Sequence, residues 1–261
     1  MFDYAHKFNI PDVLHTKVKD HCLWIFFDRK KETNPFSRKL TVAIIQLAQQ
    51  LAEDPDIKCV IFSGGKNRSF SSGGDFNDVQ TLKEFEETKL YLYEIIDLYQ
   101  AILKIPQPTI AAVDFYAIGQ GLQVSLMTDW RIATERAKIS MPELKNGVAC
   151  PLGTTILQNF FGRAQMLEDV VGCSMMTAKQ AFKKKYFNHL CKPGKLFAEA
   201  EKMAVKLTNY SQIPYSTTKK IYNEGLIAAL ESVRVPAGIA HAESIMSMSA
   251  QGHFSKILNK K

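Results

Sequence analysis

The sequence has no apolar run as long as the roughly 18 residues that a membrane-spanning helix requires, so we expect no membrane span among its 261 residues. Residues 1–6 lack the basic segment and the apolar segment of a secretory signal peptide. Residues 259–261 do not match a peroxisomal targeting signal. These absences predict a cytoplasmic protein with no membrane partner.

Cysteine and histidine are too sparse and too widely spaced for a metal centre. The five cysteines form no CxxC pair, and the six histidines show no metal-ligand spacing. An odd number of distant cysteines also argues against a disulfide framework, so most are expected to be small buried residues in a reducing compartment. We therefore expect no metal site.

Basic residues outnumber acidic ones. Lysine and arginine total 33 and aspartate and glutamate total 26, which gives a formal net charge of +7. This excess favours an anionic partner, such as nucleic acid, acidic lipid or a phosphorylated small molecule. Hydrophobic residues make up 46% of the chain and charged residues 23%, a globular composition that excludes general disorder.

Short apolar segments alternate with helical patterns in the first half of the chain. Strands are expected at residues 22–27, 58–62, 109–113 and 130–133. Apolar residues with helical spacing occur at about 36–51, 79–105 and 122–127. This βαβ series predicts an α/β fold with a parallel sheet and right-handed crossovers. From about residue 151 the pattern is almost entirely helical.

Three loops come where a strand is expected to run into a helix, which is where α/β sheets bind ligands. They are residues 69–75, 116–121 and 141–147. Free backbone N–H groups in the first two loops would stabilise negative charge, and Glu143 in the third could transfer a proton. Each loop alone is also explained by turn geometry, and Glu143 by a solvated position.

Taken in order, these segments resemble the enoyl-CoA hydratase/isomerase family, also called the crotonase superfamily. The resemblance covers nearly the whole chain. It rests on residues 28–34 (DRKKETN), 58–64 (KCVIFSG), 69–76 (SFSSGGDF), 105–133 (IPQPTIAAVDFYAIGQGLQVSLMTDWRIA), Met141-Pro142-Glu143 followed by Gly147, and 177–181 (TAKQA).

The resemblance implies an α/β spiral of ββα units in residues 1–195 and a helical, trimer-forming region in residues 196–261. It implies an acyl-CoA thioester as substrate, no separate cofactor, and a homotrimer or a dimer of trimers. Members of the family hold the thioester carbonyl between two backbone N–H groups, which stabilise an enolate oxygen. At the matching positions these groups belong to Ser72 and Gln120.

Departures from the family pattern bear on the reaction. Hydratases of the family use two glutamates, of which one matches Glu143, whereas the other position holds Gln123. An amide cannot take up a proton at neutral pH. One base suffices to move a proton between two carbons, so Δ3-to-Δ2 enoyl-CoA isomerisation is favoured, with Gln123 positioning water or substrate. Gln120 stands where glycine is usual, but its backbone N–H is unaffected.

Other activities stay open. They are hydration with a non-standard second acid, other acyl-thioester chemistry (decarboxylation, hydrolysis or carbon–carbon bond formation), and acyl-CoA binding without catalysis. Cys150 could act as a nucleophile, but no partner histidine is identifiable, so a packed thiol is favoured.

Because CoA carries phosphates, the resemblance favours a nucleotide-bearing thioester as the anionic partner. Nucleic acid is disfavoured, since aromatic and basic residues are not interleaved in the sequence. For the basic run at residues 29–31, a solvated surface is an equally good interpretation. The resemblance gives these CoA-binding candidates: Arg29, Lys30, Lys31, Ser69, Phe70 and Ser71, with Phe254 and Lys256 as weaker ones.

Overall fold

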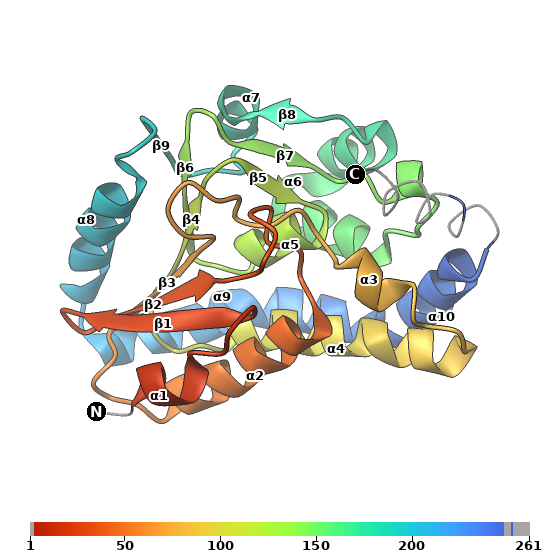
Figure 1. Cartoon of the computed structure of the whole chain (residues 1–261). Coiled ribbons are helices and arrows are strands. Elements are labelled where there is room, and N and C mark those ends of the chain that lie inside the picture. Colours follow the sequence, from red (N-terminus) through yellow and green to blue (C-terminus); the bar gives the residue numbers. More distant parts are fainter. Residues whose placement is uncertain (1–2, 248–251, 253–261) are drawn as a thin grey trace.

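A computed structural model describes residues 3–247 and residue 252 of the chain. Its centre is a six-stranded sheet with the order β1-β2-β3-β4-β6-β9 (Figure 1). All neighbouring pairs in this sheet are parallel except β1 and β2, which are antiparallel, so the predicted parallel sheet is confirmed. The strands are Leu14–Lys19 (β1), Cys22–Phe27 (β2), Cys59–Ser63 (β3), Thr109–Val113 (β4), Trp130–Thr134 (β6) and His189–Cys191 (β9).

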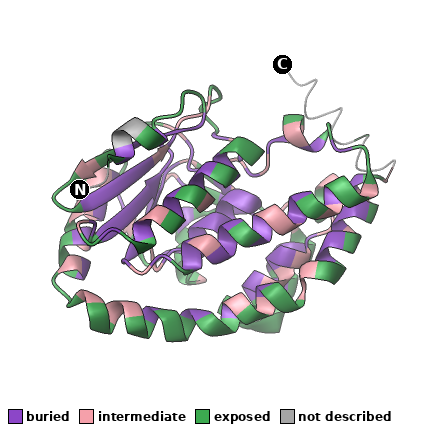
Figure 2. Ribbon diagram, turned by 90° about the horizontal axis from the view of Figure 1, so that it is seen from below, coloured by how far each residue is buried: buried purple, intermediate pink, exposed green. Residues whose placement is uncertain are grey.

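Side chains alternate between the two faces of this sheet, as the pleat requires. In β2, Leu23 and Ile25 belong to the larger core cluster, whereas Trp24 belongs to a smaller one. Helices α2 (Arg38–Ala52) and α4 (Phe85–Leu103) cover the first face, and α8 (Leu196–Thr208) covers the second. Figure 2 shows buried strands behind helices whose outer sides are exposed. Both faces are therefore covered, which explains why the strands are almost wholly apolar.

The sequence predicted the four central strands to within one residue at each end, but it missed five others, of which only β1 is longer than three residues. β1 and β9 were not expected, nor were β5 (Tyr116–Ile118), β7 (Lys138–Ser140) and β8 (Met176–Thr177). Strands of two or three residues are too short to show a period of two. The helix expected over 79–105 is divided into α3 (Phe76–Val79) and α4, because Asp75 caps α3 and the turn after it buries Leu82.

A three-stranded sheet, β5-β7-β8, brings the three loops together. β5 and β7 are parallel neighbours, so the elements that follow them lie at the same edge: α5 (Gln120–Leu126) and the 3-10 helix η1 (Leu144–Asn146). A parallel bridge between Ser71 and Ala117 places the first loop beside them. The tertiary structure thus joins three loops that are spread over residues 69–147 of the sequence.

The C-terminal part consists mainly of helices, namely α6 (Pro151–Gly172), α7 (Ala178–Lys183), α8, α9 (Gln212–Ser232) and α10 (Arg234–Ile245). A short helix at the other end, α1 (Tyr4–Phe8), packs near β1. α10 packs closely on α4, because a Cβ at position 238, which is Gly238, would lie only 2.7 Å from the side chains of Lys89 and Tyr93. α8 starts at Leu196, where we expected the helical region to begin, but the division at residue 195 stays a prediction.

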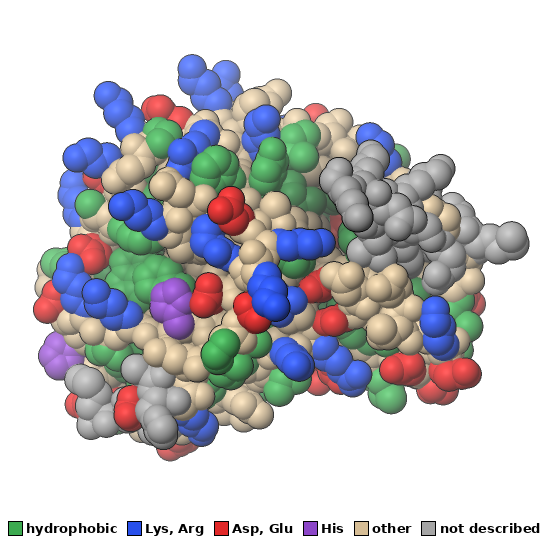
Figure 3. Space-filling view, viewed as in Figure 1, with side chains coloured by type: hydrophobic (Ala, Val, Ile, Leu, Met, Phe, Trp, Pro, Cys, Tyr) green, Lys and Arg blue, Asp and Glu red, His purple; other side chains and the backbone are tan. Residues whose placement is uncertain are grey.

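No helix among the described residues is both long enough and apolar enough to cross a membrane. Lysine and arginine side chains are spread over the face shown in Figure 3, with acidic side chains among them. Several lysine and arginine side chains of the protein are paired with acidic ones, for example Lys19 with Glu201 at 2.8 Å. The positive excess therefore does not mark out one basic patch on this face.

Candidate active site

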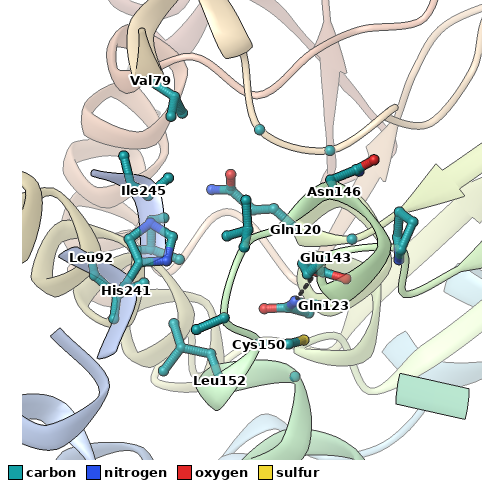
Figure 4. A pocket seen from close by; sticks show the side chains of 18 of the residues that line it. Val79, Leu92, Gln120, Gln123, Glu143, Asn146, Cys150, Leu152, His241 and Ile245 are labelled. Atoms are coloured by element: carbon teal, nitrogen blue, oxygen red, sulfur yellow. Dashed lines mark hydrogen bonds between the residues drawn. The ribbon is translucent and has the colours of Figure 1, made fainter. Parts of the chain in front are cut away.

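A cavity of about 180 Å³ lies where the three loops meet α4 and α10 (Figure 4). Gln120 and Gln123 enter it from the first turn of α5, Glu143 and Cys150 from the loop after β7, and His241 from α10. Much of the remaining wall is apolar. Among the described residues, Glu143 is the only acidic side chain that lines this cavity.

Glycine is required at the start of α5. Gly119 has φ 52° and ψ −121°, a conformation that residues with a Cβ rarely adopt. A Cβ at this position would lie 3.0 Å from Oε1 of Glu143. The Gly119 N–H donates a hydrogen bond to the Ser140 carbonyl oxygen at 2.8 Å, which ties the start of α5 to the end of β7. Gly119 therefore lets the helix start and the glutamate lie side by side.

In the first two loops, the backbone N–H groups of Gly74 and Gln120 lie at the cavity and have no acceptor among the described residues. Gln120 is the first residue of α5, where N–H groups lack helical partners. Gly74 forms a parallel bridge with Phe36 through the Gly73 carbonyl and the Asp75 N–H. The Gly74 N–H consequently points away from Phe36 and remains free to bind an anion.

The expectation for Ser72 is corrected by this geometry. Its N–H donates to the carbonyl oxygen of Thr33 at 2.8 Å, so it is not available to a substrate oxygen. Ser72 still lines the cavity, but Gly74, two residues further on, supplies the free donor of that loop. The backbone N–H of Gln120, the other expected donor, has no acceptor among the described residues.

Gln123 holds one oxygen of the Glu143 carboxyl. Its Oε1 accepts a hydrogen bond from Nε2 of Gln123 at 3.0 Å, whereas its buried Oε2 has no hydrogen-bond partner among the described residues (Figure 4). The backbone is fixed as well, because the Glu143 carbonyl accepts from the N–H groups of Asn146 and Val148, both at 2.9 Å. One carboxylate oxygen is thus positioned and the other is free for a reactant.

Burial raises the pKa of Glu143 from 4.5 to about 7, because the cavity removes water that would stabilise the carboxylate. Hydrogen bonds from its own backbone, Cys150 and Gln123 counter part of this increase. A pKa near neutrality suits a general base. Burial and the nearby Glu143 raise the pKa of the Cys150 thiol well above its usual range, which agrees with a packed thiol rather than a nucleophile.

Tyr99 fixes the orientation of the Gln123 amide. The Tyr99 hydroxyl donates to Oε1 of Gln123 at 2.8 Å, and this turns the amide NH₂ toward Glu143. Burial raises the pKa of Tyr99 well above its usual range, so the hydroxyl keeps its proton and stays a donor. This chain of hydrogen bonds is not visible in the sequence, since Tyr99 lies on a helix with many other apolar and aromatic residues.

The six CoA-binding candidates do not line this cavity. Arg29 forms an ion pair with Asp75 at 2.8 Å, and Lys30 is largely exposed. Phe70 is fully buried, with its ring 5.2 Å from that of Phe27. Their role in CoA binding stays a prediction, as does that of the two weaker candidates near the C-terminus, Phe254 and Lys256, which lie outside the described residues. Lys31 is exposed, and Ser69 and Ser71 are buried.

His241 and Gly74 line the cavity but were not among the expected site residues. His241 lies 98 positions after Glu143 on a helix with no motif, so only the packing of α10 on α4 reveals it. In the part of the chain that the structure describes, no three metal-binding side chains cluster.

Comparisons with known proteins identify the family of this chain. The family model described as Enoyl-CoA hydratase/isomerase matches residues 18–249, and the chain belongs to that family of enzymes. The chain is 36% identical to carboxymethylproline synthase of Pectobacterium carotovorum over 91% of this chain and 95% of that protein. It is 30% identical to a probable mitochondrial enoyl-CoA hydratase of Dictyostelium discoideum, over 87% of this chain and 81% of that protein.

Solved structures show the same fold. ThnE from S. clavuligerus has a TM-score of 0.73 at 28% identity, covering 86% of this chain and 98% of that one. The crotonase-like α/β fold expected from the sequence is therefore confirmed, together with its helical C-terminal part.

Proposed function

We propose that this protein is an acyl-CoA enzyme that forms a thioester enolate, with Glu143 as its one carboxylate base. The observation that carries the proposal is the pairing of a buried glutamate with Gln123 at 3.0 Å, beside two free backbone N–H groups. The thioester carbonyl would accept from the N–H groups of Gly74 and Gln120. One such donor typically contributes about 3–4 kcal/mol to stabilising an oxyanion. We propose that only the CoA of the substrate is needed, with no separate cofactor.

We propose further that the enolate forms a carbon–carbon bond. A carboxymethyl group is the two-carbon unit that an acetyl-thioester enolate delivers, and a proline ring results when it adds to a cyclic imine carboxylate. Two facts favour this reaction: the 36% identity to a carboxymethylproline synthase over nearly full length, and polar groups on the cavity wall that a fatty acyl chain does not need. Those groups are Gln120, Asn146 and His241.

The steps balance without an added oxidant or reductant. Glu143 removes a proton from the α carbon, and the electron pair moves onto the thioester oxygen. The enolate carbon then attacks the imine carbon, the C=N electron pair moves to nitrogen, and the proton held by Glu143 is returned to that nitrogen. The product is a carboxymethylproline thioester, whose free acid forms on hydrolysis. A malonyl thioester would give the same enolate by losing CO₂.

Isomerisation of a Δ3-enoyl-CoA to the Δ2 isomer is the second candidate. The same observation favours it over hydration, since Gln123 occupies the place of a second acid and Glu143 alone can carry a proton from one carbon to another. In that reaction the enolate takes its proton back at the γ carbon.

One set of assays separates these candidates. The purified protein is given acetyl-CoA in D₂O, ¹⁴C-carboxyl malonyl-CoA, 3-enoyl-CoA, or 2-enoyl-CoA, with and without 1-pyrroline-5-carboxylate. We expect α-proton exchange or CO₂ release, and a new thioester only when the imine is present. Glu143→Gln should slow exchange by about 10²- to 10⁴-fold, as general bases usually contribute.

The exposed Glu224 provides the matched control, and Glu224→Gln should behave as wild type. Isomerisation of 3-enoyl-CoA without imine coupling would favour the second candidate. Fast hydration of 2-enoyl-CoA would refute the argument from Gln123, and CoA binding without any turnover would indicate a non-catalytic member.

We also propose that the protein assembles as a homotrimer or a dimer of trimers. Large apolar side chains are exposed on the outer helices, including Val171 on α6 and Ile213 and Ile221 on α9. Exposed apolar residues in such numbers often mark contacts between subunits. Light scattering should give a mass of three or six chains, whereas a monomer would contradict the proposal.

A further inference from the structure

A second cavity, of about 160 Å³, lies at the far end of α5 from the active site. The active-site cavity is lined by Gln120 and Gln123 from the start of α5, whereas this one is lined by Leu126 from its last turn. Two other lining residues, Asn159 on α6 and Tyr222 on α9, are exposed, so the cavity opens to the surface between these helices. The enolate chemistry proposed above uses none of the residues in its wall.

Arg131 of β6 brings a guanidinium group to this cavity, although the residue is only 6% exposed. Its Nε donates to the Tyr186 carbonyl oxygen and its Nη1 to the Thr128 carbonyl oxygen, both at 2.8 Å. The third nitrogen, Nη2, has no hydrogen-bond partner among the described residues. The guanidinium carbon lies 5.9 Å from the centre of the Phe160 ring, which is also part of the cavity wall. Two nitrogens therefore hold the group in place, and the third is available to a ligand.

The positive charge of Arg131 has no carboxylate of its own. No acidic side chain in the described part of the chain forms an ion pair with it. Asp129 also lines the cavity, but its Oδ2 pairs with the buried ammonium of Lys219 at 2.7 Å, and its Oδ1 accepts from the Tyr222 hydroxyl at 2.7 Å. Two buried cations thus share one carboxylate. Because buried charges in proteins are nearly always paired, the remaining positive charge indicates an anion that completes the site.

The chemistry of the group suits an oxyanion. Burial lowers the pKa of Arg131 from 12.5 to about 10, with an opposing contribution from the charge of Asp129, so the guanidinium still carries its proton at pH 7. Its planar set of N–H donors matches the oxygen atoms of carboxylate and phosphate groups. At the mouth of the cavity, the Asn159 side-chain amide makes no hydrogen bond to another described residue, and it offers a second donor.

We propose that this cavity is a second anion-binding site, in which the guanidinium of Arg131 and the amide of Asn159 bind a small oxyanion, a phosphate or a carboxylate. The buried side chains of Leu103 and Leu226 form apolar walls beside it, and an apolar surrounding strengthens the attraction between the guanidinium and an anion. A cavity of this size suits a small ion rather than a nucleotide. The inference does not depend on the reaction proposed for the active site.

The test titrates the full-length protein with inorganic phosphate and, separately, with acetate in a calorimeter, at constant ionic strength and with chloride as the background anion. We expect wild type to bind at least one of the two. Asn159→Glu places a carboxylate at the mouth of the cavity, where it can pair with Arg131. The affinity should fall by about ten- to 100-fold, the range for one hydrogen bond to a charged group, and the melting temperature without oxyanions should rise. Gln158→Glu makes the same charge change at the neighbouring exposed residue, which does not line this cavity, and it should bind as wild type does.

Arg131→Met should also lose the binding, with circular dichroism to check its fold, and the exposed position of Asn159 keeps the test decisive if that variant does not fold. An oxyanion bound at the active site would be unaffected by Asn159→Glu, so unchanged affinity in this variant would overturn the inference. Wild type that binds neither anion would overturn it too. If, in addition, light scattering shows that Asn159→Glu lowers the mass of the assembly, Arg131 faces an acidic side chain of a second copy instead of a free ion.

Discussion

The buried carboxyl of Glu143 should make the stability of the folded protein depend on pH in a defined direction. Its pKa is about 7 in the folded protein and 4.5 in an ordinary environment, so the folded state holds this proton more tightly than the unfolded state does. Between these two values, unfolding releases a proton, and the free energy of unfolding falls as pH rises. The stabilisation is complete below pH 4.5 and lost as pH rises through 7.

The difference between the two pKa values corresponds to about 3 kcal/mol, since a tenfold change in proton affinity is worth about 1.4 kcal/mol. Glu143→Gln removes the titration and keeps the shape and the contact with Gln123. The free energy of unfolding of the variant should therefore rise relative to that of wild type by up to about 3 kcal/mol between pH 5 and pH 8. Above pH 8 the difference should stay constant.

Urea unfolding at pH 5, 6, 7 and 8, at one protomer concentration, measures this difference directly. Glu224→Gln, which removes an exposed glutamate, should show no such trend. If the free energies of unfolding of wild type and Glu143→Gln differ by the same amount at every pH in this range, the ionised carboxyl is not destabilised in the folded protein. The pKa near 7, and with it the case for Glu143 as a base at neutral pH, would then be refuted.

Further predictions concern the supports of the site. Gly119→Ala places a Cβ at positive φ and 3.0 Å from the Glu143 carboxylate. The rate of α-proton exchange should fall strongly, whereas the melting temperature should change little. An unchanged exchange rate would contradict this geometry. Tyr99→Phe removes the donor to Gln123 and should lower kcat with little change in KM for the thioester, while circular dichroism stays native; a change in KM alone would argue against a positioning role. Lys219→Met removes a buried ammonium group and leaves the Asp129 carboxylate without this partner at 2.7 Å. The variant should destabilise the fold by about 3–5 kcal/mol in urea unfolding, far more than a surface lysine variant such as Lys220→Met.

The sequence by itself determined the order of the main elements and pointed to Glu143 as the candidate base. Apolar runs as marked as CLWIFF and TIAAV specify strands that are buried on both faces, and this physical constraint is visible in one dimension. The ordered loops indicated the family, and the change from glutamate to glutamine at position 123 indicated one-base chemistry. These conclusions depend on residue identity at fixed spacing, which a sequence states completely.

The tertiary structure decided which groups at the site are free and which are already engaged. Ser72 and Gly74 are two residues apart in the same loop, yet the N–H of one is taken by Thr33 and that of the other is not. The direction of a backbone N–H depends on the local φ and ψ angles, and its availability depends on hydrogen bonds to segments that are distant in sequence. The residue types alone reveal neither. His241 became part of the site only because α10 packs on α4, a contact between residues about 150 positions apart.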